Sequence, residues 1–262
     1  MGLGTTCRLA ALFYSGVLLN QSCATVRAFV PGASISSFST EPHNFVGGTH
    51  FPREVRSSLE LRMSLKPAAI PLMDSGKALA RSGELLIDAT SVMGLYGGGL
   101  SSAGANIRNA GDCVAQAAAS CRFKTAAELV CDELREGATC LIEGVDKMKL
   151  AVEEARADKD ADLAKAIENA SKPLSVSGVS LEAAGAGIMQ RAPVAQIGEN
   201  MYNCGETLGS LAVAIGELSS SSEALESCQR MKFASEKMME AGDNLRGIKP
   251  EKKPKGKAWI KG

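Results

Sequence analysis

The sequence predicts an all-α protein, an antiparallel helical bundle of long, coiled-coil-like helices that pack through heptad seams of Gly, Ala and aliphatic residues. The first observation is a row of large apolar residues at every seventh position from Leu72 to Cys121, with a row of small residues three positions ahead of it. Two such rows with a period of seven are typical of helices packed along a seam. Similar rows return later in the chain. No stretch alternates with a period of two, so we expect no strands.

These seams are expected to supply the core of a single helical domain, residues 64–248. Aromatic residues make up only 4% of the chain although 45% of it is hydrophobic, so the core has to be built from Leu, Met, Val and Ala. The predicted seam residues are Leu79, Gly83, Leu86, Gly104, Ile107, Gly111, Val114, Leu134, Leu141, Cys204, Leu208, Leu211, Ile215 and Leu218.

The first 28 residues have the layout of a secretory signal peptide. Arg8 supplies a positive charge, and the uncharged apolar run Leu9–Leu19 is too short to span a bilayer comfortably. Val26-Arg27-Ala28 then provides the small residues that a signal peptidase needs. We therefore predict cleavage after Ala28.

Residues 29–63 are rich in Ser and poor in acidic residues, and we expect a disordered segment like a transit peptide. Together with the junction Ala28-Phe29-Val30-Pro31, this layout resembles the bipartite plastid presequence of algae with secondary, red-type plastids, such as diatoms. The resemblance covers residues 1–63 only, with Ala28 and Phe29 as the targeting residues. It implies a mature chain that begins near Ser64 and lies in the plastid stroma or at the thylakoid surface. A secreted protein is the alternative.

The first helix is expected to start at the capping residues Asp74-Ser75, because Pro67 and Pro71 favour an extended chain before it. It should run to about Gly94. Four glycines between residues 94 and 99 then predict a hairpin, with a second helix from Ser101 to Ser120. The alternative is one long helix across residues 72–121, because the heptad rows keep their phase through the glycines.

The longest helix is expected from Thr125 to Ser171, where Pro173 ends it. Residues 174–180 should then form a loop before a helix resumes near Leu181. Pro193 is expected to break or kink that helix.

A late seam repeats at every seventh residue from Ile197 to Leu225, and the Ser219–Ser222 run is expected to weaken it. A last helix carries Met231 and Met238 and should end at Gly247.

One short unit recurs along the helices: a small residue, then Gly, two variable residues and an aliphatic residue. Gly is costly in a helix unless the missing side chain is used. We interpret the unit as a place where another helix approaches the backbone closely. Examples are Ser75-Gly76, Ser82-Gly83, Ala103-Gly104, Ala110-Gly111, Cys204-Gly205 and Ala241-Gly242.

The residues that carry most enzyme chemistry are missing from the predicted mature chain. Both histidines, His43 and His50, lie in the presequence, which excludes Ser-His-Asp and Cys-His arrangements. The run 158–162 resembles the start of a calcium loop, but Leu163 and Asn169 stand where Gly and Glu are required. We interpret this run as a solvated acidic face inside a helix. No catalytic, cofactor-binding or metal-binding residue, and no cofactor, is predicted.

Six cysteines remain in the mature chain, and none of them forms Cys-x-x-Cys, which argues against zinc and thioredoxin-type sites. Cys121 and Cys204 lie on seams and should act as small apolar residues. A redox-switchable disulfide between helices is a hypothesis prompted by the plastid address.

Charge is distributed unevenly, although the formal net charge of the chain is zero. Residues 64–248 carry about −7, which disfavours nucleic acid as a partner. Residues 249–262 are rich in Lys, Pro and Gly and are expected to be disordered. Within this basic tail, Lys253, Lys255, Lys257 and Trp259 are the predicted docking residues.

The favoured function is a non-enzymatic plastid structural or interaction protein that uses helix faces to bind a protein partner or a second copy of itself. The alternative is a peripheral protein of a membrane or lipid surface, bound through amphipathic helices. An enzyme of unknown type is the third hypothesis.

Overall fold

The computed structural model describes residues 65–93, 97–122 and 127–248, and these residues contain helices and no strand. The elements are the short 3-10 helix η1 (Lys66–Ala68) and the α-helices α2 (Ala69–Met93), α3 (Gly97–Arg122), α4 (Ala127–Ala157), α5 (Ala161–Met189), α6 (Val194–Leu218) and α7 (Ser222–Arg246). The predicted all-α class is confirmed.

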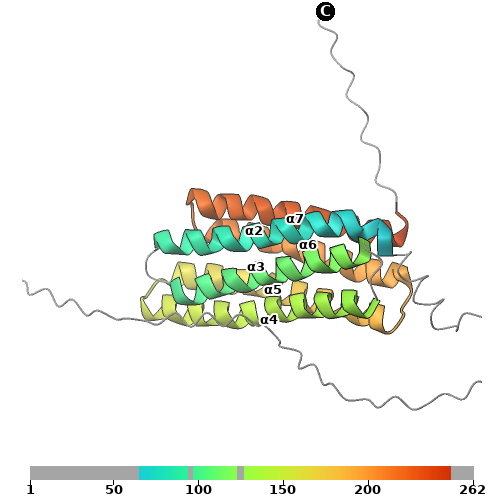
Figure 1. Ribbon diagram of the computed structural model, residues 1–262. Coiled ribbons are helices and arrows are strands. Elements are labelled where there is room, and N and C mark those ends of the chain that lie inside the picture. The colour runs from blue at the N-terminus through green and yellow to red at the C-terminus, as the bar shows by residue number, and fades with distance from the viewer. Residues whose placement is uncertain (1–64, 94–96, 123–126, 249–262) are drawn as a thin grey trace, which may run out of the picture. The chain divides into compact units, whose positions relative to one another are not determined.

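The six α-helices form a closed ring in which each helix packs against its neighbours in the chain and α7 packs against α2 (Figure 1). As residue numbers rise along one helix, the residues that they contact on the neighbouring helix fall in number. In α2, for example, Gly76 lies against Gly111 of α3, whereas Gly83, one seam position later, lies against Gly104. Consecutive helices are therefore antiparallel, and an even number of them makes α2 and α7 antiparallel as well. The structure is a closed antiparallel helical bundle.

One continuous apolar core fills the ring, and every α-helix contributes to it. The side chains at the large heptad positions have essentially no exposed surface, and each contributes about 1.5–3 kcal/mol through burial. The largest fully buried side chains include Leu72, Leu79, Leu86, Leu100, Ile107, Leu134, Leu141, Met148, Ile167, Leu174 and Leu181.

The structure contains the predicted hairpin rather than one long helix, because α2 ends at Met93 and α3 begins at Gly97. The predicted start of the second helix at Ser101 is wrong, since Gly98 and Gly99 already lie in α3. The reason is the contact with α4. A Cβ atom at Gly99 would lie 2.6 Å from the backbone nitrogen of Ala151, so this glycine is used for close approach and not for the turn.

The first helix also begins earlier than Asp74. Pro67 lies in η1 and Pro71 lies in the first turn of α2, so the extended start is wrong. A proline in a first turn lacks only an N–H group that would have no partner within the helix. Burial of Leu72 against the core adds a reason for helical structure here.

The single helix predicted from Thr125 to Ser171 is wrong, because α4 ends at Ala157 and α5 begins at Ala161. Lys159 adopts the left-handed conformation with φ 64°, and the Asp160 carboxylate accepts a hydrogen bond from the Leu163 N–H over 3.0 Å. This N-cap explains the break. The acidic run 158–162 is therefore a turn and the start of a helix, not a face inside one.

Pro173 does not end a helix, and residues 174–180 are helical rather than a loop, because both lie inside α5. An interior proline costs about 3 kcal/mol. Ile167, Leu174 and Leu181, one heptad apart, all have 0% exposed surface. Uncoiling residues 174–180 would remove much of this burial, which outweighs the cost of the proline.

The last two helices follow the prediction except at one position. Pro193 breaks the chain as expected and precedes α6, and Gly247 ends α7 in the left-handed conformation with φ 76°. The late seam stops at Leu218 and does not include Leu225, which lies on α7 with 48% of its surface exposed. The reason is the turn at residues 219–221, where Ser221 caps α7 through the Ala224 N–H.

Candidate functional site

The predicted seam residues are all buried, and their neighbours belong to other helices of the same chain. Leu79, Ile107, Leu134 and Leu211, for example, have no exposed surface. The inward helix faces are therefore occupied within the bundle. A partner has to bind the outer surface. The sequence prediction assigned partner binding to helix faces in general and did not distinguish the outer faces from the seam faces.

The glycines of the recurring unit place two helix backbones in direct contact, as we predicted from their spacing. A Cβ atom at Gly83 would lie 2.4 Å from the backbone nitrogen of Arg108, and one at Gly111 would lie 2.3 Å from that of Ala80. Gly205 and Gly242 play the same part between α6 and α7. No residue with a side chain fits these positions without a shift of the backbone.

Serine hydroxyls join α2 to α7 on the other side of α2. The Ser75 hydroxyl donates to the backbone carbonyl oxygen of Ala234 over 2.8 Å. Ser82 and Ser227 each donate to the other's carbonyl oxygen over 2.9 Å, and all three serines are fully buried. We had interpreted Ser75 and Ser82 only as small residues. The available signal is that the small residue of the unit is a serine twice in this helix, a side chain that can donate a hydrogen bond as well as fit a close contact.

Five of the six cysteines in the described residues belong to two different environments. Cys121 and Cys204 are buried, as expected for small apolar residues, and burial raises the pKa of each thiol to about 12. Burial also raises the pKa of Cys131. Cys113 of α3 and Cys140 of α4 are only half-buried, and their thiols hydrogen-bond to each other. This bond raises the pKa of Cys113 and lowers that of Cys140.

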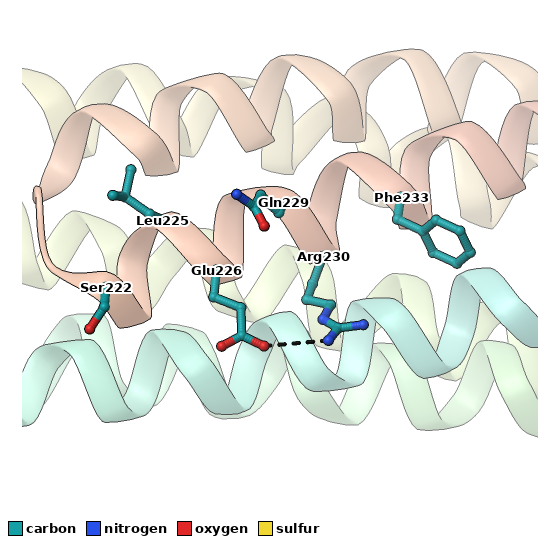
Figure 2. A pocket seen from close by; sticks show the side chains of 6 residues that line it. All are labelled: Ser222, Leu225, Glu226, Gln229, Arg230 and Phe233. Atoms are coloured by element: carbon teal, nitrogen blue, oxygen red, sulfur yellow. Dashed lines mark hydrogen bonds and ion pairs between the residues drawn. The ribbon is translucent and has the colours of Figure 1, made fainter.

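The outer face of α7 carries a shallow groove of about 680 Å³ (Figure 2). Leu225 and Phe233 expose 48% and 44% of their surfaces there, beside the ion pair between Glu226 and Arg230 at 3.4 Å. The lining residues are Ser222, Leu225, Glu226, Gln229, Arg230 and Phe233.

A second groove, of about 340 Å³, follows further along α7 and is bordered by α6. It contains three carboxylates and one aromatic ring. Its lining residues are Tyr202, Glu236, Met239, Glu240, Asp243 and Asn244. Arg246 stacks on the Tyr202 ring at 4.4 Å and pairs with Glu199 of α6 at 2.6 Å, so the basic group at this end is engaged within the protein.

One stripe on α7 connects the two grooves. Its residues are three or four positions apart, which places them on one face of the helix. We call them the α7 outer stripe: Leu225, Gln229, Phe233, Glu236, Glu240 and Asp243. The first half of the stripe has the apolar Leu225 and Phe233 on either side of the uncharged Gln229, and the second half is acidic.

Residues 65–93, 97–122 and 127–248 contain no group of three His, Cys, Asp or Glu residues placed to hold a metal ion. In the same ranges, no helix has both the length and the apolar character that crossing a membrane requires.

The predicted targeting residues Ala28 and Phe29 lie outside the described residues, as do Lys253, Lys255, Lys257 and Trp259 of the basic tail. Both assignments stay predictions.

Comparison with protein-family models, with curated proteins and with solved structures yields no match.

Proposed function

We propose that this protein is a non-enzymatic plastid interaction protein that binds a basic, amphipathic protein segment along the α7 outer stripe. The observation that carries the proposal is that the inward faces of the helices are buried in the bundle, whereas the outer face of α7 exposes large apolar side chains. Closing the ring uses the inward faces, whereas α7 keeps Leu225 and Phe233 exposed on its outer face.

The chemistry of the stripe favours a protein segment over nucleic acid. Leu225 and Phe233 are exposed and lie about two turns apart on α7. The apolar face of an amphipathic helix lying along α7 can pack on both side chains. Glu236, Glu240 and Asp243 place three carboxylates at the other end of the stripe, where Glu240 pairs with Lys237 and Asp243 pairs with Arg246. The net charge of these five side chains is −1. This charge repels phosphate groups and attracts Lys or Arg, and residues 64–248 as a whole carry about −7.

Lipid binding is the competing function. The favourable observation is that α5 exposes Val176 and Val179, with 50% and 58% of their surfaces accessible. The groove lined by Glu236, Glu240 and Asp243 opposes adsorption to an anionic lipid surface.

A photo-cross-linking amino acid placed at Phe233 in the full chain tests the proposal. We expect the chain to be recovered from isolated plastids and to yield one protein adduct there. The matched control position is Val213 on α6, which is 64% exposed and is not a residue of the stripe. Reversing charge with Glu236→Lys and Glu240→Lys should lower the adduct yield at least about tenfold, since it removes two favourable charge contacts.

Equal labelling from positions 233 and 213 would contradict a specific site on α7. Adducts with lipid alone would favour the membrane hypothesis, and recovery from the culture medium would contradict the plastid address.

A further inference from the structure

The strongest unexplained feature is a pair of cysteines from neighbouring helices at the edge of the α3–α4 interface. Cys113 directly precedes the buried Val114, and Cys140 directly precedes the buried Leu141. Both cysteines therefore flank the inward face of their own helix, and their thiols hydrogen-bond across the interface.

A glycine lets the two helices approach at this point. The Cβ atom of Cys113 lies 3.2 Å from the place that a Cβ atom would take at Gly137, one helical turn before Cys140. Because Gly137 has no side chain, nothing from this residue stands between the Cys113 side chain and Cys140.

Accessibility separates this pair from most other thiols of the bundle. Cys121, Cys131 and Cys204 are buried in the core, whereas Cys113 and Cys140 are half-exposed and can meet a reagent from solvent. Cys228 is also half-buried, and it lies beside Gly216 on α6, where an added Cβ atom would lie 3.4 Å from its sulfur. Cys228 is therefore the natural reference for an accessible thiol outside the pair.

We propose that Cys113 and Cys140 form a reversible disulfide that links α3 to α4. The oxidant is a disulfide of the low-molecular-weight or protein type, such as oxidised glutathione. The Cys140 thiolate attacks one sulfur of this oxidant, forms a mixed disulfide and releases one thiolate. Cys113 then gives up its proton to solvent and attacks the Cys140 sulfur, and the second thiolate leaves. The two protein thiols are oxidised, and one disulfide is reduced to two thiols.

The two cysteines have different roles in this sequence. Hydrogen bonding from the Cys113 thiol lowers the pKa of Cys140, so Cys140 is the better attacking group. The same bond raises the pKa of Cys113, so Cys113 is the poorer attacking group while Cys140 is a free thiol. The acidic neighbours Glu136 and Glu143 act against the thiolate of Cys140, so this advantage is partial.

Mapping the disulfides of the full chain tests the proposal. The chain is equilibrated with oxidised or reduced glutathione, alkylated, digested and analysed by mass spectrometry. Under oxidising conditions we expect peptides linked through Cys113 and Cys140, whereas Cys121, Cys131 and Cys204 are alkylated after denaturation. The melting temperature should rise by about 10 °C on oxidation, because the link closes a loop in the unfolded chain. Cys113→Ser should lose this rise and Cys228→Ser should keep it.

The two single variants report on the order of attack. Cys113→Ser should accumulate a mixed disulfide with glutathione at Cys140. Cys140→Ser should react about tenfold more slowly at Cys113, because that position lacks a low-pKa thiol.

Alkylated, unlinked Cys113 and Cys140 under conditions that modify Cys228 would overturn the proposal, and so would linkage of either residue to another cysteine. Equal reaction rates in the two variants would overturn the assigned order. Mapping of the unmodified chain decides the main point without any variant that might fold poorly.

Discussion

Helix α2 packs against α3 on one side and against α7 on the other, and the two interfaces use different chemistry. Toward α3 it presents Gly76 and Gly83, and toward α7 it presents Ser75 and Ser82. Successive residues of a helix are about 100° apart around its axis. Each Ser-Gly pair therefore serves two neighbouring helices at once, while the large heptad residues point into the core.

The difference shows two ways of bringing helices together. At the glycine interface the backbones touch, so close packing holds the helices and no side chain is tolerated. At the serine interface a small side chain separates the backbones, and its hydroxyl bonds to a carbonyl oxygen of the partner helix. Each such bond contributes about 1 kcal/mol and holds the two helices in one register.

Helix α5 repeats this two-sided arrangement with a hydroxyl, since Gly178 faces α4 and the Ser177 hydroxyl lies 2.8 Å from that of Thr207 on α6. Helix α3 repeats it without one. In α3, Gly104 faces α2, whereas the carbonyl oxygen of the preceding Ala103 lies near Gly144 of α4. In α7, Gly242 faces α6. In the small-Gly unit, the glycine thus contacts one neighbouring helix and the small residue before it contacts the other.

The largest expected effect comes from adding a side chain at the glycine interface. Gly83→Ala should destabilise the fold by roughly 2–3 kcal/mol, because its Cβ atom would meet backbone atoms of α3 that cannot move independently. This loss should appear although Ala is intrinsically the better helix former by about 1 kcal/mol. Urea unfolding followed by circular dichroism measures the change.

The matched control is Gly216→Ala in α6. An added Cβ atom there would make an ordinary contact of 3.4 Å with the Cys228 sulfur, so helix propensity should stabilise the protein by up to about 1 kcal/mol. If the two substitutions had the same sign and size, direct backbone contact at Gly83 would not be what limits that position.

A smaller effect is expected at the serine interface. Ser82→Ala and Ser227→Ala should each cost about 1 kcal/mol, since each removes one buried hydrogen bond and leaves no bulky clash. The double variant should lose less than the sum, by roughly 0.5–1 kcal/mol, because the two hydroxyl oxygens also lie 2.9 Å apart and interact. Strict additivity in the unfolding free energies would contradict a coupled pair.

The smallest effect concerns a carboxylate in the α3–α4 interface and depends on pH. Burial raises the pKa of Glu133, although the hydrogen bond from the Ser120 hydroxyl, at 3.1 Å, opposes the shift. A raised pKa in the folded state means that stability falls as pH rises through the carboxyl range. Glu133→Gln should therefore stabilise the protein by a few tenths of a kcal/mol at pH 8 and by nothing near pH 3. Urea unfolding of both proteins at pH 8 and pH 3 measures the difference in unfolding free energy. An equal difference at the two pH values would contradict a raised pKa for Glu133.

Local pattern predicted the inward face of the helices well, because a heptad row reports which residues are apolar on one side. Leu134 and Leu141 were assigned to the core from spacing alone, and both are fully buried. The same pattern does not predict where a helix ends. A heptad row reads alike across a hairpin and along one helix, so the break at Lys159 was missed despite the capping residue Asp160.

The cysteine pair shows why the candidate sites were harder to predict. Cys113 and Cys140 each precede a seam residue, which places both at the flank of an inward face. Spacing does not say which neighbouring helix that flank meets, and no Cys-x-x-Cys motif draws attention to the pair. The α7 outer stripe was missed for a related reason, since Leu225 continued a heptad row into a helix where that position faces outward.

The sequence by itself determined the all-α class, the heptad faces and the glycines that let helices approach, because these depend on periodicity and side-chain size within one segment. The tertiary structure decided the closure of the ring through Ser82 and Ser227, which are 145 positions apart, and the helical state of Pro173. Both outcomes depend on burial gained between distant segments, and this gain outweighs local preferences that favour a break or leave the partner open.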